Sequence, residues 1–177
     1  MVGALRSASI GDNMEHDSMN DPFVWPAPPA LLPLAHIECR VGALVSLGPA
    51  AYGERRYVPL TGGSVSGPEL HGEIVAGGVD WQIQRADGVL DIAAHYVVRA
   101  YDGALIEVRS DGMRHGPPAV MQRLARGEPV EAGEYWFRTA VRFDTGAPAW
   151  LHLNKVLAIA SGRREAKLVV LDLWRVG

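Results

Sequence analysis

EYWFRTAVRFDTG, residues 134–146, alternates between two unlike sets of side chains. A repeat of two residues predicts a β-strand whose two faces differ. One face would carry Tyr135, Phe137, Thr139, Val141 and Phe143, and the other Glu134, Trp136, Arg138, Ala140, Arg142 and Asp144. The charged face can point into water and leave the aromatic face in a dry core. Alternatively, it can line an interior that holds guanidinium groups, which would make this strand part of a binding site.

Similar alternating runs cover the chain from about Leu34 onwards, and Asp-Gly pairs at 87–88, 102–103 and 111–112 separate several of them. Asp-Gly between alternating runs is typical of hairpin turns and predicts an antiparallel meander. Long strands are expected at 133–145, 149–160 and 167–176, and a helix at 117–126, where prolines precede apolar residues at helical spacing and a glycine follows them. Because closing the sheet removes its open edges, we predict an all-β fold, an antiparallel up-and-down barrel of about eight or more strands with one short helix.

Length and composition limit the domain organisation and the partners. The 177 residues fit one barrel domain over 34–177, after a disordered or extended N-terminal arm over 1–33 that is polar and then rich in proline. The net charge of −3 lacks the basic surplus of a nucleic-acid-binding protein, and no apolar run is long enough to span a membrane. Cys39 is the only cysteine, which excludes an intramolecular disulfide and agrees with a cytoplasmic location.

Two of the late segments are apolar on both faces. In AWLHLNKVLAIA, residues 149–160, one face would carry Trp150, His152 and Asn154, and the other Leu151, Leu153, Leu157 and Ile159. A strand that is apolar on both sides must be covered on both sides. If the leucines face a second copy of the chain or the helix, Trp150, His152 and Asn154 face the barrel interior. We therefore expect a homodimer or a higher homo-oligomer.

Four segments together resemble a bacterial and fungal family known as domain of unknown function 3237, or uncharacterised protein family 0311. They are VPLTGGSVSGPELHGEIVAGGVDWQ, DGALIEVRSDGMRHGPP, EYWFRTAVRFDTG and WLHLN, and the resemblance runs from about Leu34 to the C-terminus. It implies a compact β-barrel with a cavity, often oligomeric, and no established family-wide activity. It points to the motif positions Asp80, Trp81, Tyr96, Arg99, Arg109, Arg138, Phe143, Trp150 and Asn154. It also favours an inward Arg138, because a dry core does not call for an arginine there.

We expect four catalytic residues, Arg138, Asp80, Tyr96 and His152. The Arg138 guanidinium would hold a carboxylate or an enolate. Asp80, in a semi-buried site against Trp81, would have a raised pKa suited to moving a proton, and His152 is a second candidate base. Tyr96 would donate a hydrogen bond to a developing oxyanion. The structural alternatives are a surface arginine, a turn-capping aspartate and a tyrosine that satisfies a backbone carbonyl.

Further residues are expected to shape the pocket or bind the ligand: Trp81, Arg99, Tyr135, Trp150, Asn154 and Arg142. No metal is expected, since the histidines are scattered and zinc needs three or four converging ligands. No cofactor is expected either. The glycine-rich TGGSVSG run, residues 61–67, lacks the Gly-Lys-Ser/Thr of a phosphate-binding loop and indicates turns and bent strands.

The sequence therefore predicts a small-molecule site inside a barrel. Its best enzymatic form is a cofactor-independent acid–base enzyme, an isomerase, lyase or cyclase, that acts on a small carbonyl or carboxylate compound. The alternative is a carrier or sensor that binds a hydrophobic organic acid without turnover. A third possibility is a structural oligomer whose interior is filled.

Overall fold

A computed structural model describes residues 25–177 of the chain, so most of the expected N-terminal arm lies outside the described residues. The first strand begins at Leu31, three residues before the expected start of the barrel domain. The elements are β1 Leu31–Val41, β2 Val45–Ala50, β3 Gly53–Ser66, β4 Gly72–Gln84, β5 Leu90–Ala100, β6 Leu105–His115, α1 Pro118–Ala125, η1 Ala132–Glu134, β7 Trp136–Asp144, η2 Pro148–Lys155, β8 Leu157–Arg164 and β9 Leu168–Val176. Helix α1 is within one residue of the expected helix at each end.

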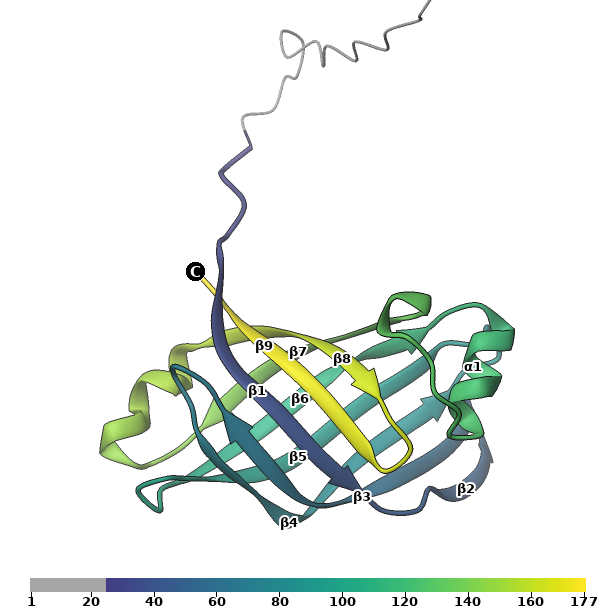
Figure 1. Cartoon of the computed structure of the whole chain (residues 1–177), viewed down its shortest axis with the longest axis horizontal. Coiled ribbons are helices and arrows are strands. Elements are labelled where there is room, and N and C mark those ends of the chain that lie inside the picture. The colour runs from purple at the N-terminus through teal and green to yellow at the C-terminus, as the bar shows by residue number, and fades with distance from the viewer. Residues whose placement is uncertain (1–24) are drawn as a thin grey trace, which may run out of the picture.

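The strands close into a barrel (Figure 1). From β3 to β9, strands that follow one another in the chain pair antiparallel. Helix α1 and the 3₁₀ segment η1 lie in the connection between β6 and β7, and η2 lies between β7 and β8. Strand β1 pairs with β9 on one side and with β3 on the other, which closes eight strands, and β2 adds a ninth strand beside β3. The predicted all-β antiparallel barrel is confirmed, and closure pairs both edges of each of the eight barrel strands, whereas β2 pairs with β3 alone among the described strands.

Glycines bend β3 and β4 where the barrel wall turns. The β3–β4 register shifts between Pro59 and Gly63, and the β4–β5 register shifts between Val75 and Val79. Gly62 and Gly77 lie inside these shifts with φ of +116° and +114°, a region that side chains other than glycine rarely adopt. The glycine-rich segments thus form bulges, as their composition indicated.

Gly63→Ala tests the closure between β1 and β3. A Cβ at Gly63 would lie 2.1 Å from the Glu38 carbonyl oxygen and 3.0 Å from the Cys39 Cα, so the two strands would have to separate. We expect the free energy of unfolding to fall by about 1–3 kcal/mol, as overpacked sites do. The matched control is Gly133→Ala, where a Cβ meets nothing within 4 Å. Urea titration of both variants measures the difference, and equal stabilities would contradict this closure.

The faces of β7 correct one expectation. Phe137, Thr139, Val141 and Phe143 are the buried set, each no more than 6% exposed, so the aromatic face is the inner one. Arg138 lies on the outer face, where its Nη1 donates to the Phe137 carbonyl oxygen at 2.8 Å and its guanidinium lies 5.8 Å from the Trp136 ring. The inward placement of Arg138 was therefore wrong. Because Phe137 and Thr139, the two neighbours of Arg138 in the strand, occupy the inner face, alternation places Arg138 on the outer one.

The expected strand at 149–160 is also corrected. Residues 148–155 form the 3₁₀ segment η2, and β8 begins only at Leu157. Pro148 starts η2, and Trp150 and Leu153, three residues apart, are its buried residues. Leu153 is fully buried instead of facing outwards, whereas His152 is exposed and so does not face the interior.

The barrel interior divides into an apolar end and a polar end. Near η2, the fully buried side chains are Leu34, Leu70, Ile106 and Leu153. Helix α1 lies at the opposite end of the barrel from η2 (Figure 1), and the inward polar residues of β4, described below, lie at the α1 end. The homo-oligomer stays a prediction, because this single chain does not test it.

Candidate functional site

Strand β4 is built with its polar face inwards. Asp80, Gln82 and Gln84 alternate with Trp81 and Ile83. Gln82 is only 7% exposed, whereas Trp81 is 38% exposed on the outer wall. This inversion of the usual pattern places a carboxyl group and two amides inside the barrel at its α1 end.

A chain of hydrogen bonds holds these groups in place. The Gln82 Nε2 donates to Asp80 Oδ2 at 2.6 Å, and the Arg56 Nε on β3 donates to Gln82 Oε1 at 3.1 Å. The Arg56 Nη2 donates to Gln84 Oε1 at 3.3 Å, and Gln84 in turn donates to the Val89 carbonyl oxygen. The hydrogen bond from Gln82 fixes Oδ2 of Asp80, and the position of Oδ1 in the same carboxyl group is fixed with it.

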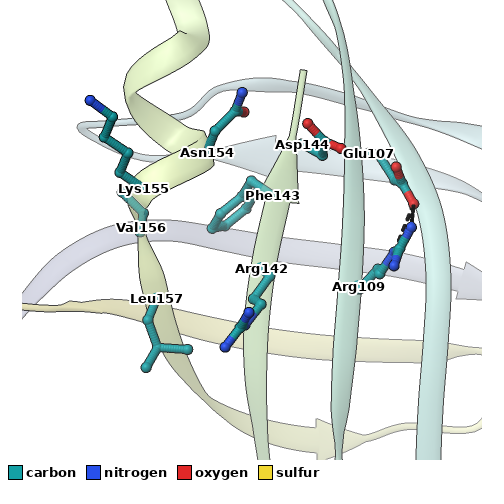
Figure 2. A pocket seen from close by; sticks show the side chains of 9 residues that line it. All are labelled: Glu107, Arg109, Arg142, Phe143, Asp144, Asn154, Lys155, Val156 and Leu157. Atoms are coloured by element: carbon teal, nitrogen blue, oxygen red, sulfur yellow. Dashed lines mark hydrogen bonds and ion pairs between the residues drawn. The ribbon is translucent and has the colours of Figure 1, made fainter. Parts of the chain in front are cut away.

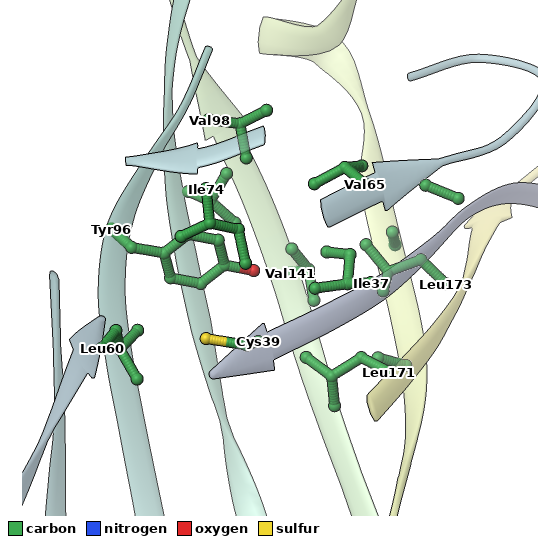
Figure 3. Packing of buried hydrophobic residues seen from close by; sticks show 14 of the residues in the cluster. Ile37, Cys39, Leu60, Val65, Ile74, Tyr96, Val98, Val141, Leu171 and Leu173 are labelled. Carbon is green, nitrogen blue, oxygen red and sulfur yellow. The ribbon is translucent and has the colours of Figure 1, made fainter. Parts of the chain in front are cut away.

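Three buried polar atoms have no hydrogen-bond partner within the described part of the chain. They are Asp80 Oδ1, the Tyr96 hydroxyl and Arg114 Nε. Figure 3 shows the Tyr96 ring reaching from β5 into the interior, with Cys39 of β1 nearby. Buried polar atoms are nearly always paired, so three unpaired ones in a single barrel interior indicate groups that are free to bind a ligand or water.

The environment of Asp80 changes its ionisation. Burial raises the pKa of Asp80 from 3.8 to about 6, against the opposing effects of the Gln82 hydrogen bond and of Arg114, the Ala93 backbone and Arg56. The charged or titratable groups that interact with it from the surrounding strands are Cys39 on β1, Arg56 on β3, Arg114 on β6 and Arg164 on β8. The Asp80 carboxyl can therefore gain and lose a proton near neutral pH.

Neighbouring groups keep their protons. Burial and the nearby Asp80 raise the pKa of the Cys39 thiol to about 12, so it is a protonated core residue at neutral pH. Burial also raises the pKa of Tyr96 above its ordinary value, so its hydroxyl remains a hydrogen-bond donor. Asp80 is thus the group in this cluster that exchanges a proton most readily near neutral pH.

Two arginines that sequence reasoning missed share the polar end with Arg56. Arg114 of β6 places its guanidinium 5.8 Å from the Phe137 ring centre. Arg164 ends β8, and its backbone N–H donates to the Tyr135 hydroxyl at 2.8 Å. Burial lowers the pKa of all three guanidinium groups, that of Arg114 to about 10.

Of the expected site residues, Asp80 and Tyr96 contribute the unpaired interior atoms. Tyr135 is buried beside the same end, with its hydroxyl bound to the Arg164 backbone. One signal in the sequence could have identified the missed residues Arg56, Gln82 and Arg114. Each lies an even number of residues from an inward residue on its own strand and therefore shares its face. That signal becomes readable only after one residue of each strand is known to point inwards.

The other expected residues lie on the outer wall or at the η2 end. Trp81 packs against Tyr57 with ring centres 5.2 Å apart, and Arg99 pairs with Glu73 at 2.6 Å. Trp150 is buried and donates to Asp102 Oδ2 at 2.8 Å. Asn154 accepts from the Thr145 N–H and donates to the Thr145 carbonyl oxygen, so its amide fastens the turn after β7. The structure does not bring these side chains to Asp80.

A second candidate is a groove of about 530 Å³ on the outer wall (Figure 2). It is lined by Glu107, Arg109, Arg142, Phe143, Asp144, Asn154, Lys155, Val156 and Leu157. One of its two carboxylates, Glu107, already pairs with Arg109 at 2.7 Å and with His95 at 2.5 Å, and both partners lower its pKa. An ionised, paired carboxylate on an open surface is poorly suited to proton transfer, so the barrel interior is the better candidate site.

Metal centres and membrane spans are the other kinds of site to consider within residues 25–177. No group of three or more His, Cys, Asp and Glu side chains in this range is arranged to hold a metal ion. None of the helices in the same range is long and apolar enough to cross a membrane.

The fold and site define a closed antiparallel β-barrel with a polar cluster in its interior. The chain belongs to the family described as protein of unknown function DUF3237, which matches residues 29–176. It is 37% identical over 140 residues to the UPF0311 protein RPA1785 of Rhodopseudomonas palustris, covering 79% of this chain and 92% of that protein. The crystal structure of RPA1785 matches with a TM-score of 0.83 at 34% identity, over 86% of this chain and all of that one.

Fungal relatives extend the comparison to enzymes. The hydroalkoxylation enzyme phnH of Penicillium herquei is 28% identical over 117 residues, covering 66% of this chain and 63% of that protein. A crystal structure of an enzyme from Penicillium herquei matches with a TM-score of 0.67 at 25% identity, over 88% of this chain and 99% of that one. The barrel fold is therefore shared with enzymes, at distant identity.

Proposed function

We propose that this protein is a cofactor-independent acid–base enzyme that acts on a small carbonyl or carboxylate compound inside the barrel. One observation carries the proposal. Asp80 has one oxygen fixed by Gln82 and one buried oxygen without a partner, and its pKa lies at about 6. A positioned carboxyl group with a pKa near the working pH is what general acid–base catalysis requires.

In this proposal, Asp80 and Tyr96 have separate roles. The free Oδ1 of Asp80 takes a proton from the substrate or returns one to it. The Tyr96 hydroxyl, protonated and unpaired, donates a hydrogen bond to the oxygen on which negative charge develops. Arg138 and His152 are not part of this mechanism, because both lie outside the barrel.

The fungal relative supports this class of chemistry. Hydroalkoxylation adds an O–H bond across a C=C bond, so one proton leaves the oxygen and one proton is delivered to carbon. The reaction consumes no oxidant or reductant, and a single carboxyl group that exchanges protons can serve both transfers. Isomerisation and elimination next to a carbonyl need the same proton transfers, which is why the proposal covers isomerases, lyases and cyclases alike.

Deuterium exchange tests the proposal without knowledge of the natural substrate. The full chain would be incubated in D₂O with small oxo acids, cyclic ketones and a short alkenyl alcohol, and exchange or ring closure would be followed by proton NMR. We expect exchange next to a carbonyl above the buffer rate, rising as pH increases through about 6, because the ionised Asp80 is the base.

The same experiment separates the enzyme from a carrier. A thermal-shift measurement on the same compounds reports binding independently of turnover. A compound that raises the melting temperature and undergoes no exchange at any pH favours the non-catalytic carrier or sensor. An exchange rate that is flat between pH 5 and 8 would contradict the role of Asp80.

A homo-oligomer and a cytoplasmic location stay predictions.

A further inference from the structure

We infer that the ligand of the barrel interior is an organic anion, and that Arg114 receives its carboxylate or phenolate oxygen between Arg56 and Arg164. This inference names the substrate class of the interior site and so rests on the proposed function. It also assigns to Arg114 the anion-binding role that the sequence had suggested for Arg138.

The first support is the charge balance of the polar end. Three guanidinium groups, from Arg56, Arg114 and Arg164, share it with two carboxyl groups, that of Asp80 and that of Glu54, whose charge acts on Arg56. None of the three arginines has a carboxylate within 4.0 Å among residues 25–177. Uncompensated positive charge away from water is unfavourable, and an anion bound there would offset it.

The outer wall offers a contrast. There, Arg99 pairs with Glu73 at 2.6 Å and Arg109 with Glu107 at 2.7 Å. The fold thus supplies carboxylate partners to several exposed arginines, where such pairs contribute little. It leaves the interior arginines without one, where a pair would matter most.

The second support is the geometry of Arg114. Its Nε is buried and has no partner, and its guanidinium lies over the Phe137 ring, which fixes the side chain from one side. The Nε edge of a guanidinium offers two parallel N–H donors, which match the two oxygens of a carboxylate. Arg56 donates its Nε to Gln82 and Arg164 donates its Nη1 to the Leu168 carbonyl at 3.1 Å, so both are held by other groups. Arg114 is therefore the arginine best placed to receive the anion.

The ionisation of Arg114 agrees with an anion-binding role. Its pKa falls to about 10, first because of burial and next because of the positive charge of Arg164. A guanidinium in this environment remains charged at neutral pH and gains stability from a negative ligand.

Benzoate and benzamide form a matched pair of probes, since they share a shape and differ in charge. Isothermal titration of the full chain at pH 7 should show benzoate binding, with benzamide at least about 10-fold weaker. Arg114→Gln is expected to weaken benzoate binding about 10- to 100-fold and to leave benzamide unchanged. The control is Arg55→Gln on β3, because Arg55 faces outwards over Trp81 at 5.5 Å. Equal losses in both variants, or no preference for benzoate up to about 10 mM, would overturn the inference.

A second variant tests the inference without any ligand. Arg114→Met keeps an apolar contact with Phe137 and removes the uncompensated charge. We expect its melting temperature without ligand to equal or exceed that of the natural chain, by up to about 2–4 °C. A fall of similar size would show that Arg114 is structural and would overturn the inference.

Asp80→Asn distinguishes this inference from the proposed function. It should abolish proton exchange and keep the preference for benzoate over benzamide. If the natural chain binds benzoate through Arg114 and exchanges no proton in any probe, the proposed enzyme fails and the anion site stands. If exchange occurs and Arg114→Gln leaves the preference for benzoate intact, the anion site fails and the enzyme stands.

Discussion

Asp80→Asn is expected to lower the rate of proton exchange by about 10²–10⁴-fold and, at pH 8, to raise the free energy of unfolding by about 3 kcal/mol. The two effects have one cause. Above pH 6 the natural chain holds an ionised carboxylate in a site where burial disfavours the charge, and Asn imitates the neutral acid. A change that stabilises the fold while it removes activity is typical of a residue kept for function.

The pH dependence of this stabilisation has a definite sign. The pKa of Asp80 is raised in the folded chain, from 3.8 to about 6. The favourable contribution of Asp80 to the free energy of unfolding is therefore fully present below pH 3.8 and is lost as pH rises through about 6. The variant and the natural chain should have equal stability at pH 3.5 and differ by the full amount at pH 8, as measured by urea titration.

Asp111→Asn is the control, because Asp111 is exposed on the outer face of β6. We expect it to change neither activity nor the pH dependence of stability. If Asp80→Asn is less stable than the natural chain at pH 8, the carboxylate is a structural ion pair partner of Arg114 and Arg56, and the catalytic assignment is wrong.

The second large effect concerns the apolar end of the barrel. Leu153→Ala is expected to lower the free energy of unfolding by about 2–5 kcal/mol, because Leu153 is fully buried and its removal leaves a cavity. Leu151→Ala, two residues earlier in η2, should change it by less than about 0.5 kcal/mol, because Leu151 is 47% exposed.

Chemical denaturation of the two leucine variants measures this difference directly. The comparison also tests whether η2 closes the barrel as a 3₁₀ segment. If residues 149–160 formed a strand, Leu151 and Leu153 would share one face, and the two substitutions would have similar effects. Equal losses would therefore contradict the described fold at this end.

The barrel could be predicted from sequence because its signals are local. Alternating side chains indicate the strands, and Asp-Gly at 87–88 and 102–103 marks two of the hairpin turns, whereas Asp111 and Gly112 lie inside β6 and form no turn. Closure follows from the need to cover the edges. The helix at 118–125 has equally local signals in its prolines and in the glycine that follows. The sequence also singled out Asp80 and Tyr96, whose polar atoms are buried and unpaired in the interior, and their catalytic roles stay predictions.

Local sequence does not determine which face of each strand points into the barrel. Alternation in β7 defines two faces and does not say which is inside, so the placement of Arg138 was wrong even though the strand was predicted. Strand β4 has the opposite arrangement, with Asp80 and Gln82 inside and Trp81 outside. The position of each strand in the closed sheet decides this, and it depends on register across the whole barrel.

The arginines of the polar end were missed for the same reason. Arg56 and Arg114 lie 58 residues apart in the sequence and approach Asp80 only through the β3–β4, β4–β5 and β5–β6 pairings. The 3₁₀ segment η2 was missed because a spacing of three between Trp150 and Leu153 was outweighed by apparent alternation over the longer run.

The most direct test of the interior site is the pKa of Asp80 itself. Carbon-13 NMR of the carboxyl groups in the full chain, titrated from pH 3 to 8, would follow each aspartate, and the signal absent from Asp80→Asn identifies Asp80. We predict a midpoint at about 6. A midpoint near the ordinary value of 3.8 would mean that Asp80 is solvated or firmly paired, and would contradict an acid–base site inside the barrel.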